Sequence, residues 1–112
     1  MPILNPNYSE LNFDEMAAAI GLKAKHIPML VGSFLEESES IMNNLENAIS
    51  QKNFDDIKSY AHSIKGSAGN LKFNDIYEMA KEVELSAASQ NDSFEYETYF
   101  QAIKTAISTI PS

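Results

Sequence analysis

The segment from Lys58 to Lys72 carries the residues of this sequence that are best suited to chemistry. Five residues of this segment, which we call the stripe, follow one another at steps of four, three, four and three residues: Lys58, His62, Lys65, Gly69 and Lys72. In an α-helix this spacing brings side chains to one side. The stripe is basic, whereas the whole chain has 16 acidic residues, eight lysines, no arginine and a net charge of −8. The contrast indicates a local site on one helix face.

His62 has the properties of a phosphoryl acceptor. A neutral imidazole is available near physiological pH and is a good nucleophile. Lys65, one helical turn further on, can neutralise the roughly two negative charges of an attached phosphoryl group. Gly66, four residues after the histidine, leaves the space beside the ring open. We therefore predict that His62 is a nucleophile and that Lys65 is its charge partner.

Other kinds of site are excluded by what the sequence lacks. A di-metal helical bundle needs Glu-x-x-His pairs, and neither His26 nor His62 has a glutamate three residues before it. Two histidines without any cysteine supply too few ligands for an ordinary zinc site. The KGS run at residues 65–67 lacks the earlier glycine and the preceding strand of a phosphate-binding loop. We expect no metal, no cofactor and no nucleotide site, and we interpret His26 as structural.

Composition limits the class of protein further. A chain of 112 residues with 44% hydrophobic residues fits one domain, residues 1–112, with residues 1–11 as an N-terminal arm. The negative charge argues against nucleic acid and anionic membrane surfaces as partners. The longest uncharged stretch, residues 26–35, is too short to span a bilayer. The absence of cysteine and of a signal peptide leads us to expect a cytoplasmic location.

Hydrophobic residues recur every three or four positions and never alternate for long, which predicts an all-α fold. Helices are expected at residues 13–20, 28–51, 54–71, 74–89 and 94–110. The last four are joined by short turns, which is typical of an antiparallel four-helix bundle. The short first helix is expected to lie across one end of that bundle.

Capping residues support these boundaries. Asn12 with Glu15, and Asp92 with Glu95, have the spacing of a capping pair, and Asn53 is expected to cap the third helix. The long helix at residues 28–51 is expected to bury Val31, Phe34, Ile41, Leu45 and Ile49. We interpret Met29, Met42 and Met79 as core side chains.

The segment AHSIKGSAGNL, at residues 61–71, resembles the signature of histidine-containing phosphotransfer domains, in which a lysine follows the phospho-accepting histidine by three residues and precedes a small residue. Members of that family are four-helix bundles, and the helices expected here cover nearly the whole chain. The resemblance implies a module that accepts a phosphoryl group from an aspartate of one response-regulator receiver domain, or from a kinase. The module then passes the group reversibly to an aspartate of another receiver.

The resemblance also assigns roles to single residues. His62 would be phosphorylated on Nε2, with Lys65 as counter-charge and Gly66 giving the receiver room to approach. Glu84, on the following helix, matches the position from which family members orient the histidine through Nδ1. Other candidate partner-binding residues are Lys58, Ser67, Gly69, Asn70 and Lys72. Lys72 departs from the family pattern, because a glycine usually stands there.

The implied partners are receiver domains and a sensor histidine kinase or hybrid kinase, with any magnesium held by the receiver. We expect a monomer without its own ATP site, and therefore not a stand-alone kinase. Two alternatives stay open. One is a helical module that binds a receiver or kinase without carrying phosphate, and the other is a structural bundle with no such role.

Overall fold

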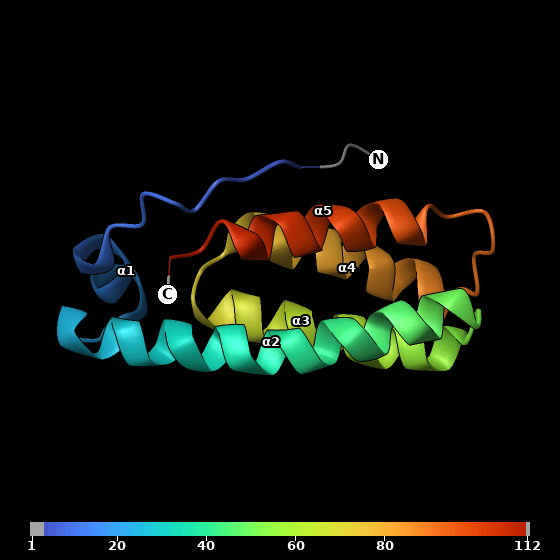
Figure 1. Ribbon diagram of the computed structural model, residues 1–112, viewed down its shortest axis with the longest axis horizontal. Helices are drawn as coiled ribbons and strands as arrows, with labels where there is room; N and C mark the ends of the chain where they lie inside the picture. The colour runs from blue at the N-terminus through green and yellow to red at the C-terminus, as the bar shows by residue number, and fades with distance from the viewer. Residues whose placement is uncertain (1–3, 112) are drawn as a thin grey trace.

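The protein is all-helical in a computed structural model that describes residues 4–111. Four helices run side by side along the long axis (Figure 1): α2 (Ile27–Ser50), α3 (Phe54–Asn70), α4 (Asn74–Ala88) and α5 (Tyr96–Ser108). A short helix, α1 (Phe13–Ile20), lies at one end, and a 3₁₀ turn, η1 (Ala24–His26), leads from it into α2. The molecule measures 43 × 25 × 21 Å. The predicted fold class, a helical bundle with the first helix at one end, is confirmed.

The N-terminal segment crosses the bundle before α1 begins. Residues 4–12 run along α5 in Figure 1, and the Tyr8 amide donates to Thr109 Oγ1 at 2.9 Å. The Tyr8 ring packs against Phe73, with ring centroids 4.9 Å apart. This segment therefore ties the start of the described chain to the end of α5 and the start of α4.

Local sequence explains where α1 and α3 begin. Asn12 Oδ1 accepts from the Glu15 amide at 3.1 Å, and Asn53 Oδ1 accepts from the Asp56 amide at 3.2 Å. Both caps satisfy N–H groups that a helix leaves unpaired in its first turn. Both caps were predicted, and the glycine after α1, Gly21, has the expected left-handed backbone with φ of 76°.

Three other helices also end in a left-handed residue, and none of the three is glycine. Lys52, Lys72 and Gln90 have φ values of 53°, 62° and 54°. After α3, the Phe73 amide donates to the Ala68 carbonyl at 2.9 Å and the Lys72 amide to the Gly69 carbonyl at 3.2 Å, the two bonds of a Schellman cap. Lys72 thus adopts the left-handed backbone that glycine adopts most readily, and α3 ends in a regular cap without a glycine.

The predicted start of α5 is wrong. The helix begins at Tyr96, and its cap residue, Glu95, makes no capping side-chain bond. Asn91 organises the turn instead, because its Oδ1 accepts from the amide and hydroxyl of Ser93 at 3.0 and 2.9 Å, while the Tyr96 hydroxyl donates to its carbonyl at 2.7 Å. An asparagine that bonds the backbone two residues on builds a turn in place of the predicted Asp92–Glu95 cap pair.

The core fills the space between the four long helices. Fully buried side chains include Leu45 of α2, Ile64 of α3, Met79 of α4 and Ile103 of α5. The buried face of α2 consists of Ile27, Val31, Phe34, Ser38, Met42, Leu45 and Ala48. Ile41 and Ile49 are only half-buried, so the inward face is rotated slightly from the predicted one.

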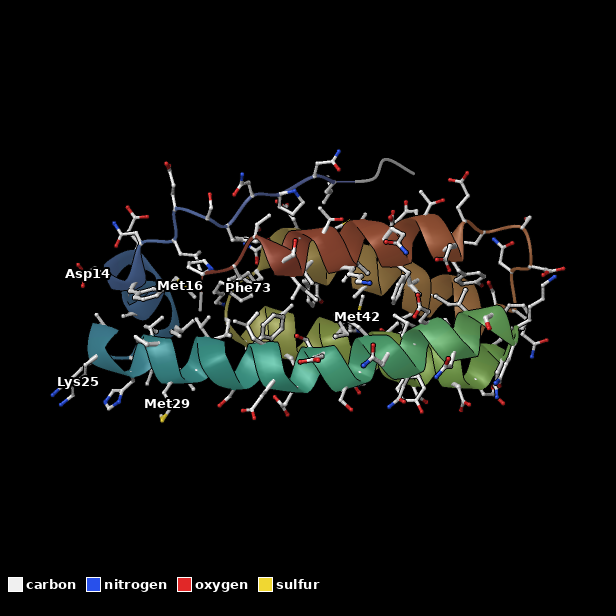
Figure 2. All side chains as sticks on the ribbon, viewed as in Figure 1. Asp14, Met16, Lys25, Met29, Met42 and Phe73 are labelled. Carbon is white, nitrogen blue, oxygen red and sulfur yellow. The ribbon has the colours of Figure 1, made fainter. Side chains whose placement is uncertain are left out.

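The prediction of Met29 as a core residue is wrong. Its side chain is 66% exposed, and Figure 2 shows it on the outer side of α2, with its sulfur turned away from the bundle. Met42 and Met79 are buried as predicted. Within residues 4–111, no helix combines the length and the apolar character needed to cross a bilayer.

Candidate functional site

His62 lies in the middle of α3 with its ring in solvent. Its neighbours Ala61 and Ile64 point into the core, which fixes the helix and therefore the direction of the ring. The His62 side chain is 67% exposed. A ring anchored on a rigid helix and open to water is accessible to another protein.

Glu84, from the adjacent helix α4, orients this ring. His62 Nδ1 lies 2.8 Å from Glu84 Oε2, and the carboxylate side chain is only 14% exposed. Because an ionised carboxylate only accepts hydrogen bonds, Nδ1 carries the proton in this pair. Nε2 then has the free lone pair, and it makes no hydrogen bond within the described chain. In the neutral ring, Nε2 is therefore the unprotonated nitrogen of an exposed side chain.

Lys65 also contacts Glu84. Its Nζ lies 2.6 Å from Glu84 Oε1, and its side chain is 22% exposed. The two carboxylate oxygens are thus divided between the imidazole and the ammonium. We call these three residues, His62, Lys65 and Glu84, the histidine site.

The charges within the histidine site favour an ionised Glu84. Partial burial opposes ionisation, but the hydrogen bonds and charges of Lys65 and His62 outweigh it and lower the pKa of the Glu84 carboxyl below 4.5. The hydrogen bond to Glu84, against a smaller effect of desolvation, raises the pKa of Lys65 above 10.5. At neutral pH the pair is a carboxylate and an ammonium.

The two glycines of the stripe have different surroundings. A Cβ on Gly66 would meet no atom within 4 Å, so the surface beside His62 is open there. A Cβ on Gly69 would lie 3.2 Å from Cδ2 of Tyr77 on α4. Gly69 therefore allows the close packing of α3 on α4, the most extensive helix contact in the molecule.

The packing of α3 on α4 also fixes which residues meet. Tyr77 lies seven residues before Glu84, and Gly69 lies seven residues after His62. Seven residues are about two helical turns, so two antiparallel helices bring both pairs together in the same register. Tyr77 was missed from the sequence, although its spacing from Glu84 would have placed it on the same helix face.

The remaining predicted partner-binding residues fall into two groups. Lys58, with Ser59, lines a shallow hollow of about 350 Å³ beside His62 and Glu84. Ser67 and Asn70 lie towards α2 and line a separate, smaller hollow with residues such as Leu30 and Glu37. Neither side chain makes a hydrogen bond within the described residues. The hollow at Ser67 and Asn70 is therefore distinct from the histidine site.

Two further residues near the site were not predicted. Ser59 precedes His62 by three residues and shares its face, which the helical spacing alone could have indicated. Leu85 follows Glu84 and is 58% exposed, an apolar side chain at the surface of α4.

Lys72, the last of the predicted partner-binding residues, is exposed at the turn beyond α3. Among residues 4–111, no group of three or more His, Cys, Asp or Glu residues could hold a metal ion.

A helical bundle that carries an exposed histidine, oriented by a carboxylate from the next helix and flanked by a lysine, defines a class of histidine-bearing helical modules. The family model described as "Hpt domain" matches residues 29–111, which include all of α3, α4 and α5 and nearly all of α2. The chain belongs to this family, the phosphotransfer modules of two-component systems, whose partners are receiver domains and kinases. No curated protein and no solved structure matches the chain.

Proposed function

We propose that His62 is a phosphorelay acceptor, which takes a phosphoryl group from a receiver aspartate or a kinase and passes it to another receiver. The observation that carries this proposal is the 2.8 Å contact between His62 Nδ1 and Glu84 Oε2 on a ring that is 67% exposed. In the neutral ring this contact keeps the proton on Nδ1, so that Nε2 is unprotonated and accessible, as a nucleophile must be.

The transfer follows from that geometry. The Nε2 lone pair attacks the phosphorus of the receiver's aspartyl phosphate, the N–P bond forms, and the P–O bond to the aspartate breaks. The aspartate leaves as a carboxylate. Nδ1 keeps its proton, so the phosphorylated ring is cationic, and the Glu84 carboxylate balances this charge. The reverse reaction uses the same atoms.

The domain contributes position and charge to this reaction. Phosphoryl transfer has a loose transition state, for which alignment and charge neutralisation supply most of the catalysis. Lys65 keeps Glu84 ionised and adds positive charge next to the ring. Magnesium, in this proposal, belongs to the receiver's acidic pocket.

The partners dock where the histidine is open. The exposed ring, the empty surface at Gly66 and the neighbouring Lys58 form the approach to the receiver. Both proteins are expected to be acidic, so local contacts and not long-range attraction set the affinity. We propose transient complexes of a monomer in the cytoplasm.

The first experiment measures the intact mass of the protein after incubation with phosphoramidate, a small-molecule phosphodonor. We expect one acid-labile phosphoryl adduct on the wild type and none on His62→Gln. His26→Gln is the matched control, because His26 is also exposed but belongs to η1, and this variant should still form the adduct.

A folded wild-type protein without any adduct would contradict the proposal. The alternative, a module that binds a receiver or kinase without carrying phosphate, would then be favoured. Receiver binding by a wild-type protein that forms no adduct would support that alternative, whereas no receiver binding at all would favour a structural bundle.

A further inference from the structure

Two anionic groups near His62 need a cation: the Glu84 carboxylate and, after transfer, the phosphoryl group. Lys65 has the position of a counter-charge in the sequence, but in the structure its ammonium is bound to Glu84 Oε1 at 2.6 Å. With the lysine in place this oxygen is covered, and the whole Glu84 side chain is only 14% exposed. If Lys65 moved to the phosphoryl oxygens, the carboxylate would lose a charged hydrogen-bond partner, which is unfavourable.

Glu84 cannot be released from Lys65 without affecting the ring as well. Its other oxygen accepts from His62 Nδ1, and both contacts favour the ionised carboxylate. After phosphorylation the ring is cationic, so Glu84 must remain a carboxylate. In the phosphorylated state, therefore, Glu84 needs Lys65 to stay ionised while the phosphoryl group also needs a cation. One lysine cannot fill both places.

Lys58 is a second lysine close to His62. It lies one turn before His62 and lines the hollow that His62, Ser59 and Glu84 also border. Within residues 4–111 its exposed ammonium forms no ion pair, not even with Asp55 three residues earlier. Its four-carbon stem is flexible, so the ammonium can reach across the hollow to a group attached to His62.

The direction of the histidine side chain agrees with this arrangement. In an α-helix the Cα–Cβ bond tilts towards the N-terminus, so a side chain covers the turn before its own Cα. The ring of His62 therefore lies over the turn that contains Lys58 and Ser59. A group attached to Nε2 would occupy the hollow that these residues line.

We propose that Lys58 supplies the ammonium that binds the phosphoryl oxygens on His62, while Lys65 acts as a positioning residue that holds Glu84. This inference rests on the proposed function, because it concerns the phosphorylated state of His62. It moves to Lys58 the counter-charge role that the sequence assigned to Lys65.

The test is a ³¹P NMR titration of the protein phosphorylated with phosphoramidate, at low ionic strength. A cation bound to the phosphoryl group favours the dianion and lowers its second pKa, which is about 6 without a partner. We compare the wild type with Lys58→Gln, Lys58→Arg and Lys65→Gln. The matched control is Lys104→Gln, which removes the same charge from α5, a helix with no substantial contact with α3.

We expect Lys58→Gln to raise the pKa of the phosphoryl group by about 0.7, the size expected for a unit charge some 4 Å away in water. Lys58→Arg should restore the wild-type value, and high salt should reduce the difference. Lys65→Gln and Lys104→Gln should change this pKa by much less. A structural role of Lys58 alone would not produce this pattern.

A shift with Lys65→Gln and none with Lys58→Gln would overturn the inference, as would equal shifts in Lys58→Gln and Lys104→Gln. If the wild type forms no adduct on His62, the proposed function itself is wrong and this inference is rejected with it. That outcome is seen before either lysine is changed, so the two failures are distinguishable.

Discussion

At the scale of single residues, the histidine site depends on one carboxylate that serves two neighbours. Glu84 Oε2 fixes the proton of the His62 ring, and Glu84 Oε1 holds the Lys65 ammonium. Loss of the carboxylate would therefore free both partners at once. This sharing makes Glu84 the residue at which the ring's tautomer can be tested most directly.

We predict that Glu84→Ala changes the tautomer of the neutral His62 ring. In the wild type the carboxylate accepts from Nδ1–H and leaves Nε2 unprotonated. Without that acceptor, the proton should move in most molecules to Nε2, the nitrogen that attacks in the proposed transfer. The ¹⁵N chemical shifts of the two ring nitrogens, recorded at pH 9, distinguish the two tautomers.

Glu84→Gln is the control for this measurement. The glutamine amide oxygen can still accept from Nδ1–H, so the wild-type tautomer should be largely kept. The rate of phosphorylation by phosphoramidate should fall in Glu84→Ala and fall less in Glu84→Gln. Identical ring shifts in all three proteins would show that Glu84 does not select the tautomer.

At the scale of the helix, α3 carries two glycines with opposite consequences. Glycine costs about 1 kcal/mol relative to alanine inside a helix, so each needs a reason to be there. Gly69 has one in the structure, because the Tyr77 ring packs where its Cβ would be. Gly66 has none within the fold, since the space beside it is open. Access for a partner is the remaining reason.

We predict that Gly66→Ala stabilises the protein and slows transfer. The free energy of unfolding in urea should rise by about 0.5–1 kcal/mol, because alanine favours the helix and meets no clash. Phosphorylation by phosphoramidate should be unchanged, since the donor is small. Transfer to or from a receiver domain should become slower, because the added methyl group stands beside the ring.

Gly69→Ala provides the comparison. Its new Cβ would press on Tyr77 at 3.2 Å, so the helix gain is offset and the stability should rise less than in Gly66→Ala. A Gly66→Ala protein that exchanged phosphate with receivers at the wild-type rate would remove the argument for access.

At the scale of the whole molecule, the histidine site links its charges to folding. The chain has a net charge of −8, so most carboxylates repel one another, but Glu84 is held between a lysine and a histidine. Its lowered pKa means that the folded state favours the carboxylate more than the unfolded state does. The site therefore contributes to stability only while Glu84 is ionised.

We predict that the wild type has a higher free energy of unfolding than Glu84→Gln at neutral pH. This difference should be largest there and should disappear in acid. The contribution of Glu84 is complete above the unfolded pKa, about 4.5, and disappears as the pH falls through the lower folded value. The contribution of Lys65, whose pKa is raised, is complete below about 10.5 and is lost as the pH rises through the folded value. Urea unfolding of both proteins from pH 3 to pH 8 would measure the acid side. A difference between them that did not change with pH would contradict this assignment.

Much of the architecture could be predicted from the sequence because it depends on local physics. The spacing of apolar residues gave the helices, and Asn12, Gly21 and Asn53 gave three of their ends, since caps act within a few residues. The predicted start of α5 was wrong because Asn91 and Asp92 are both able to build a turn, and it is Asn91 that makes the hydrogen bonds of this turn, with Ser93 and Tyr96. Met29 was misjudged because hydrophobicity alone does not tell which side of α2 faces the core.

The sequence by itself identified the candidate residues of the histidine site, because His62 and Lys65 lie three residues apart on one helix face and the family resemblance pointed to Glu84. Only the tertiary structure decided how they interact. The antiparallel packing of α3 on α4 brings Glu84, 22 residues away in the chain, to 2.8 Å from the ring and to 2.6 Å from Lys65. Spacing along a helix fixes which face a side chain occupies, but a contact between helices depends on their register. That register is set by the whole core, including the Tyr77 ring on Gly69.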